Sequence, residues 1–155
     1  MRITKPILLI GFMLLVAPPI SAQSQSNLVG AELLGRAGIY SANYERLLQP
    51  RVGVGIGLAY WRISNGNTLI VPLYASATPI GRTHSLYIAA GATVGISNET
   101  FWGSNRPYET ATFGTVTWGY QFRSPGGFVI RPTVNLFYRD RESVIWPGFT
   151  IGHVF

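Results

Sequence analysis

Hydrophobic and small or polar residues alternate along most of the chain, and residues 51–61 show the pattern most clearly. Every second position there carries a bulky apolar side chain, and nearly all the positions between them are glycine or alanine. A period of two is that of a β-strand, whose successive side chains point to opposite faces. The bulky positions are Val52, Val54, Ile56, Leu58 and Tyr60. The stretch therefore predicts a strand with one apolar face and one nearly bare face.

The same two-faced pattern recurs along the rest of the chain, separated by turn-like residues, and no stretch shows a convincing period of 3.6. The predicted strands are about ten to fourteen residues long, which suits strands that cross a membrane at a tilt rather than globular strands. They cover residues 27–36, 38–48, 51–61, 67–78, 85–96, 109–122, 127–139 and 144–155. We predict an all-β fold, a closed antiparallel eight-stranded up-and-down transmembrane β-barrel, with both ends of the chain on one side.

The orientation of the two faces decides between a membrane barrel and a soluble one. Beyond residue 22 the chain has ten Arg and six Asp plus Glu in roughly 133 residues, about half the charge of a soluble surface. Aromatic residues lie toward the strand ends on the apolar face, as in the girdles of membrane barrels. These observations place the apolar face outward. The alternative is a soluble, secreted lipocalin-like ligand carrier with the apolar face inside.

The first residues have the pattern of a cleavable secretory signal peptide. Arg2 and Lys5 precede an apolar run of about eleven residues, and small residues near Ala22 suit cleavage. A membrane-spanning helix needs roughly 20 apolar residues, so this run is too short to be one. We assign residues 1–22 to a signal peptide and 23–155 to the barrel domain.

Charge and composition exclude several classes of function. Ten Arg against six acids give the mature chain a net charge of +4, which fits contact with anionic lipid or lipopolysaccharide, or ion pairs inside the barrel. The chain has no cysteine, which excludes thiol chemistry and Cys-ligated metals. The glycines of residues 53–57 are not a nucleotide loop, because no helix follows them. We predict no cofactor, no metal site, and no nucleotide or nucleic-acid partner.

The last strand ends in alternating apolar residues and a final aromatic: Phe149, Ile151 and Phe155 share one face with His153. This pattern resembles the C-terminal signal by which the assembly machinery recognises outer-membrane barrels, although His153 departs from it. The layout of the chain is similar to the small eight-stranded outer-membrane family that includes the OmpX-like and OmpA-barrel proteins. YSANYER (residues 40–46) and IWPGFTIG (145–152) look like recurring elements of a poorly characterised bacterial barrel group. The resemblance implies residence in the outer membrane and no particular activity.

Polar side chains on the other face predict a filled interior, because eight strands enclose just enough space for side chains. They could form a polar conduit or ligand site, or a plug of paired charges, and we favour the plug. The predicted inward cluster is Glu32, Glu45, Tyr74, Tyr87, Gln121, Arg131, Asn135 and Arg139.

The outer loops carry the residues best suited to contact a partner. Phe101, Trp102 and Arg106 lie in the loop 97–107, and Arg141 lies in 140–143. Aromatic residues with Arg are typical of interfaces, although they also fit girdle positions and solvated loops. The two histidines are far apart, and no Ser or acid is placed to form a triad with either. We predict a structural or surface-interaction role without catalysis.

Three prolines fall inside predicted strands, where each removes a hydrogen-bond donor from the ladder. Pro72, Pro132 and Pro147 suggest the runner-up function, a lipid-handling or lipid A-modifying barrel with a weakened lateral seam around the last two strands. Strand direction predicts Pro132 nearer the periplasm and Pro147 nearer the outside, so that they would not form one gap.

Overall fold

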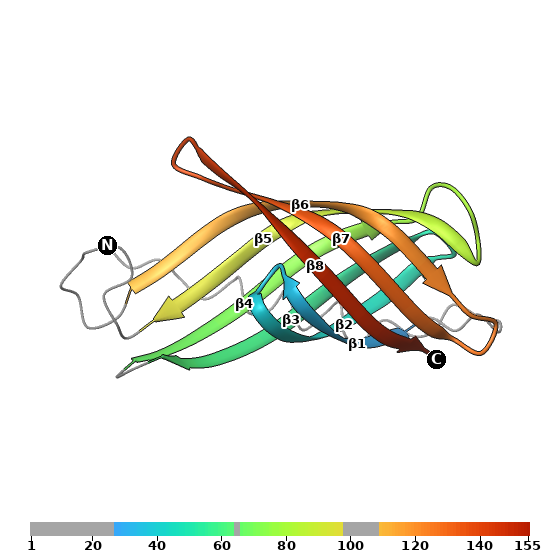
Figure 1. Cartoon of the computed structure of the whole chain (residues 1–155), viewed down its shortest axis with the longest axis horizontal. Coiled ribbons are helices and arrows are strands. Elements are labelled where there is room, and N and C mark those ends of the chain that lie inside the picture. Colours follow the sequence, from blue (N-terminus) through green and yellow to red (C-terminus); the bar gives the residue numbers. More distant parts are fainter. Residues whose placement is uncertain (1–26, 64–65, 98–108) are drawn as a thin grey trace.

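Eight antiparallel strands close into one barrel in the computed structural model, which describes residues 27–63, 66–97 and 109–155 (Figure 1). Every strand begins and ends within two residues of its predicted bounds, and the predicted fold class is confirmed. No helix among the described residues is long and apolar enough to cross a membrane. The strands are β1 (Asn27–Gly35), β2 (Gly38–Gln49), β3 (Val52–Ile63), β4 (Gly66–Ala77), β5 (His84–Ser97), β6 (Glu109–Arg123), β7 (Phe128–Arg139) and β8 (Glu142–Val154).

The barrel closes where β1 meets β8. Leu28 pairs with Val154 at the start of this ladder, and Leu33 pairs with Phe149 at its end. Asn27 and Phe155 exchange two backbone hydrogen bonds of 3.0 and 2.8 Å beyond it. We call this the terminal end; it also holds the β2–β3, β4–β5 and β6–β7 turns, and the opposite end is the far end.

The apolar face points outward along all the strands, and the polar face points into the barrel. On β3, for example, Ile56 and Leu58 are about half exposed, whereas Ala59 is buried. The largest fully buried side chains include charged ones, among them Arg131, Glu32 and Glu45. The soluble-carrier alternative, which required an apolar interior, is therefore wrong.

The barrel wall is lower at the β1–β2 turn than elsewhere at the far end. Pairing of β8 with β1 stops at Phe149, but β8 continues along β7 as far as Glu142. Figure 1 shows the β7–β8 hairpin projecting well beyond the β1–β2 turn. The turn folds inward, and its two residues, Arg36 and Ala37, are each only 2% exposed. The backbone oxygen of Arg36 accepts a 3.2 Å hydrogen bond from Thr93 of β5, so the turn reaches across the interior.

The two prolines of the last strands lie closer together than strand direction suggested. Pro132 pairs with Phe149, and Pro147 pairs with Val134, so Pro132 lies only two positions nearer the terminal end along the same ladder.

The β7–β8 ladder is nevertheless unbroken, from Phe128 opposite His153 to Arg139 opposite Glu142. Two other ladders are interrupted instead, each at a position next to a proline. The β6–β7 pairing skips the positions beside Pro132, and the β3–β4 pairing skips those beside Pro72. The ladder between the last two strands is therefore intact, and the interruption around them lies between β6 and β7, beside Pro132.

Candidate functional site: the polar interior

The most extensive group of contacts in the interior is centred on Arg131 of β7. Its Nη1 donates to Glu45 Oε2 on β2 at 2.9 Å, a buried ion pair. Its Nε and Nη2 donate to Gln121 Oε1 on β6 at 3.0 and 2.6 Å. Because a planar guanidinium presents its donors in a fixed fork, one arginine can hold these two acceptors on opposite sides of the interior. We call Arg131, Glu45 and Gln121, with the hydroxyl donors to Glu45, the Arg131 cluster.

Two hydroxyl groups of β4 complete the surroundings of Glu45. Ser76 Oγ donates to Glu45 Oε1 at 2.6 Å, and Tyr74 Oη donates to Glu45 Oε2 at 3.4 Å. Both oxygens of the carboxylate therefore accept hydrogen bonds in addition to the ion pair. A buried charge needs this many partners, because leaving water costs several kcal/mol per ion.

A second ion pair lies nearer the far end and is less complete. Arg36 Nη2 lies 3.3 Å from Glu32 Oε1, and Glu32 Oε2 accepts from Asn43 Nδ2 at 3.3 Å and from Ser41 Oγ at 3.5 Å. We call these four residues the Arg36 cluster. Within the part of the chain that the structure describes, Arg36 Nε, Glu32 Oε1 and Asn43 Oδ1 are buried without a hydrogen-bond partner.

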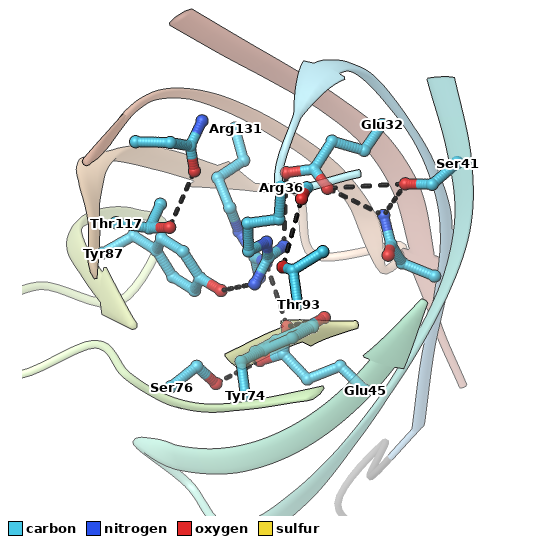
Figure 2. A network of polar contacts seen from close by, with 12 residues as sticks. Glu32, Arg36, Ser41, Glu45, Tyr74, Ser76, Tyr87, Thr93, Thr117 and Arg131 are labelled. Carbon is cyan, nitrogen blue, oxygen red and sulfur yellow. Dashed lines mark hydrogen bonds and ion pairs between the residues drawn. The ribbon is translucent and has the colours of Figure 1, made fainter. Parts of the chain in front are cut away.

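Two tyrosines join the clusters (Figure 2). The guanidinium carbon of Arg36 lies 3.6 Å from the centre of the Tyr74 ring, and that of Arg131 lies 3.8 Å from the centre of the Tyr87 ring. Arg36 Nη1 also donates to Tyr87 Oη at 3.3 Å. Each tyrosine thus contacts both clusters, because Tyr74 also donates to Glu45. Cation–π contacts of this kind contribute about 2 kcal/mol where water is excluded.

Glycine on β3 provides the space for this packing. A Cβ at Gly55 would lie 2.2 Å from Tyr74 Cζ, and one at Gly57 would lie 2.2 Å from Asn43 Oδ1. No larger residue fits without moving these side chains. The bare face of residues 51–61 therefore has a packing role.

The free space directly beside the Arg131 cluster is small. The cavity beside Glu45 and Arg131 measures about 20 Å³, room for about one water molecule. Toward the far end, the inward β1–β2 turn covers the clusters. The arrangement holds paired charges inside the barrel.

The structure places the predicted inward residues as follows. Arg139 is half-buried near the far end, where its Nε donates to Asp140 Oδ2 at 3.0 Å. Asn135 is buried, accepting from Thr117 Oγ1 at 2.7 Å and donating to the Trp146 carbonyl at 3.3 Å. The others lie in the clusters or join them: Glu32, Glu45, Tyr74, Tyr87, Gln121 and Arg131.

Sequence reasoning missed Arg36, Asn43 and Ser76. Arg36 lay at the end of a predicted strand, next to a turn, where a solvated arginine is the ordinary expectation. Its position four residues after Glu32 was the available signal, because even spacing on a strand puts two side chains on one face.

The other predicted site residues that the structure describes do not lie in the interior clusters. Phe149, Ile151 and Phe155 lie on the outer surface and are partly exposed. Arg141 is exposed in the β7–β8 turn, with a φ of 72°. The loop residues Phe101, Trp102 and Arg106 lie outside the described residues. Among the described residues, no group of three or more His, Asp or Glu could hold a metal ion.

No family model matches the chain, and no curated protein matches it. Among solved structures, it is similar to the N-terminal β-barrel domain of Pseudomonas aeruginosa OprF, with a TM-score of 0.69, 15% identity, and coverage of 85% of this chain and 98% of that one. It is also similar to Yersinia pestis Ail in a phospholipid bilayer nanodisc, with a TM-score of 0.51, 17% identity, and coverage of 84% and 97%. Ail in complex with the heparin analogue sucrose octasulfate gives 0.50, 18%, 84% and 94%. These likenesses show that the chain has the fold of a small outer-membrane β-barrel.

Proposed function

We propose that the protein is an integral outer-membrane barrel with a sealed interior and that it acts as a structural or surface-interaction element of the cell envelope. The observation that carries the proposal is the distribution of side chains: paired charges inside, and an apolar surface outside. This is the reverse of a soluble protein. It suits a hydrocarbon surrounding, in which every backbone polar group must be paired and, among structures built of strands, only a closed barrel meets that condition.

Aromatic side chains at the two rims of the barrel support membrane insertion. Tyr60 and Tyr138 are exposed on the outer face toward the far end, and Tyr120 and Phe128 toward the terminal end. Membrane barrels carry such girdles where hydrocarbon meets the head groups. They also place short turns in the periplasm and longer loops outside. The longest connection, residues 98–108 between β5 and β6, belongs to the far end, which supports a periplasmic position for the terminal end.

Transport and lipid chemistry are less well supported than a surface role. A diffusion pore needs an open path, and the two clusters with the inward turn occupy the interior. A lipid-handling barrel needs a slot for an acyl chain beside its reactive groups. Glu45 with the Ser76 hydroxyl is a carboxylate–hydroxyl pair of the expected kind, but the cavity beside it measures only about 20 Å³. We therefore propose no catalytic role.

The far end is the candidate interaction surface. Phe101, Trp102, Arg106 and Arg141 belong to its loops by sequence. Arginine and aromatic residues together bind anionic saccharides and lipopolysaccharide well, through charge-assisted hydrogen bonds and ring contacts. One structure of Ail is a complex with a heparin analogue, so a barrel of this fold can hold an anionic sugar.

Membrane fractionation tests this proposal. We expect the native protein in the outer-membrane fraction, released only by detergent, with an unboiled band that migrates differently from the boiled one. Recovery of folded protein from the periplasm without detergent would contradict it. For the surface role, binding of purified barrel to lipopolysaccharide should weaken at least fivefold when Trp102 and Arg106 are both replaced by Ala.

A further inference from the structure

The terminal end of the barrel contains a hollow that the interior clusters do not use. Its volume is about 530 Å³, within the range of small-molecule sites. Three arginines line it from three different connections: Arg51 beside the β2–β3 turn, Arg82 in the β4–β5 loop and Arg123 at the end of β6. We call it the terminal hollow.

No carboxylate lines the terminal hollow. Glu45 lines the neighbouring small cavity, where it is buried and paired with Arg131. Of the other acids in the described residues, Glu109, Asp140 and Glu142 lie at the far end, and Glu32 lies in the Arg36 cluster. The side chains that line the terminal hollow therefore include three arginines and no acid.

Several polar groups around the terminal hollow are held in place. Arg51 Nη1 donates to the Pro79 carbonyl at 2.8 Å, which fixes this side chain across the β4–β5 loop. Gln121 also lines the hollow, and its Oε1 already accepts two hydrogen bonds from Arg131. The amide group of Gln121 consequently has its NH₂ left to offer a ligand. Thr83 and Ser85 add hydroxyl groups.

We propose that the terminal hollow binds a soluble molecule that carries a phosphate monoester. Three guanidinium groups match a phosphate monoester, with a charge of about −1.5 to −2, better than a single carboxylate. Ser85, Gln121 and Arg123 occupy inward-facing strand positions, so the hollow opens along the barrel axis and not toward the surrounding lipid. A lipid head group would meet the outer face of the rim instead. The binding chemistry does not depend on the proposed function. Only the statement that the ligand comes from the periplasm rests on the proposed function, which places the terminal end there.

Titration of the purified full-length barrel in a zwitterionic detergent with glucose 6-phosphate tests the proposal. We expect saturable binding with one ligand per barrel, at least tenfold tighter than acetate. Arg82→Gln and Arg123→Gln should each weaken binding about tenfold, because each removes charged hydrogen-bond donors. Arg46→Gln is the matched control: it removes the same charge at the same end, but Arg46 does not line the hollow. The heat-modifiable band of each variant shows that it is folded.

Absence of saturable binding by the wild-type barrel would overturn the proposal. So would an Arg46→Gln variant as weak as Arg82→Gln, which would indicate a general attraction to positive charge. Binding to phosphatidylglycerol nanodiscs, with no binding of glucose 6-phosphate, would assign the arginines to lipid instead. Each of these results could occur in a barrel that fractionates with the outer membrane, so the site can fail while the proposed function stands.

Discussion

The two ion pairs of the interior differ in what holds them. In the Arg131 cluster both charged residues lie on strands, and hydrogen bonds reach Glu45 from β4 and β7. In the Arg36 cluster the arginine lies in a two-residue turn, outside the β-ladder. One cluster is therefore fixed by the barrel on all sides, whereas the other is fixed on one side by a short connection.

Their hydrogen bonding differs in the same direction. Both oxygens of Glu45 accept hydrogen bonds, but Glu32 Oε1 and Arg36 Nε, which are also buried, have no such partner among the described residues. Buried polar groups without partners cost about 1–3 kcal/mol each. The comparison teaches that burial alone does not decide how much an ion pair contributes to stability. We infer that the Arg131 cluster stabilises the barrel more than the Arg36 cluster, which mainly covers the interior toward the far end.

Arg131→Met should have the largest effect, a loss of about 3–5 kcal/mol in the free energy of unfolding, because it leaves Glu45 as a buried charge without its cation. Urea unfolding in phosphatidylcholine vesicles, followed by tryptophan fluorescence, measures it. The double variant Glu45→Met with Arg131→Met is the control and should lose less, since no charge remains unpaired. A double variant less stable than Arg131→Met would contradict the importance of pairing.

Gly55→Ala tests whether close packing fixes the Arg131 cluster. The new methyl group would meet the Tyr74 ring, which is itself held against Arg36, so we expect a loss of about 1–3 kcal/mol. Gly95→Ala is the matched control on β5, because its nearest atom outside its own chain neighbours would be 3.9 Å away. The same unfolding measurement should find Gly95→Ala close to wild type. Equal losses would mean that strand glycines matter for the backbone and not for packing.

Arg36→Met should cost less than Arg131→Met, about 1–2 kcal/mol, because Arg36 donates fewer side-chain hydrogen bonds than Arg131 and Glu32 keeps those from Ser41 and Asn43. Comparison of the two unfolding midpoints under identical conditions measures this. If both variants lost the same stability, the difference between strand-held and turn-held pairs would have no energetic meaning.

Tyr87→Phe should have the smallest effect, about 1 kcal/mol or less. It removes the hydroxyl that accepts from Arg36 but keeps the ring beneath Arg131. Tyr87→Leu removes the ring as well and should cost more. Unfolding of the two variants side by side separates the hydrogen bond from the ring contact, and a Phe variant as unstable as the Leu variant would contradict this division.

Much of the fold could be predicted from the sequence, because a period of two is a direct consequence of strand geometry. The same alternation assigned Glu45, Gln121 and Arg131 to one face, and closure of the barrel then brings such residues together. The outward direction of the apolar face followed from the low charge of the chain and was confirmed.

The partners within the interior could not be predicted, because they depend on the stagger of strands around the barrel. Arg131 and Glu45 are 86 positions apart in the sequence, and only the closed ladder brings them within reach. The inward fold of the β1–β2 turn was missed as well. No residue pattern in the sequence shows that β8 extends farther toward the far end than β1.

The most direct test of the sealed interior is conductance of the purified barrel in a planar lipid bilayer. We predict no stable open channel for the wild-type protein, because paired charges and the inward turn fill its interior. A steady, reproducible conductance from folded wild-type barrel would contradict that account. It would mean that the clusters line a path and do not close one.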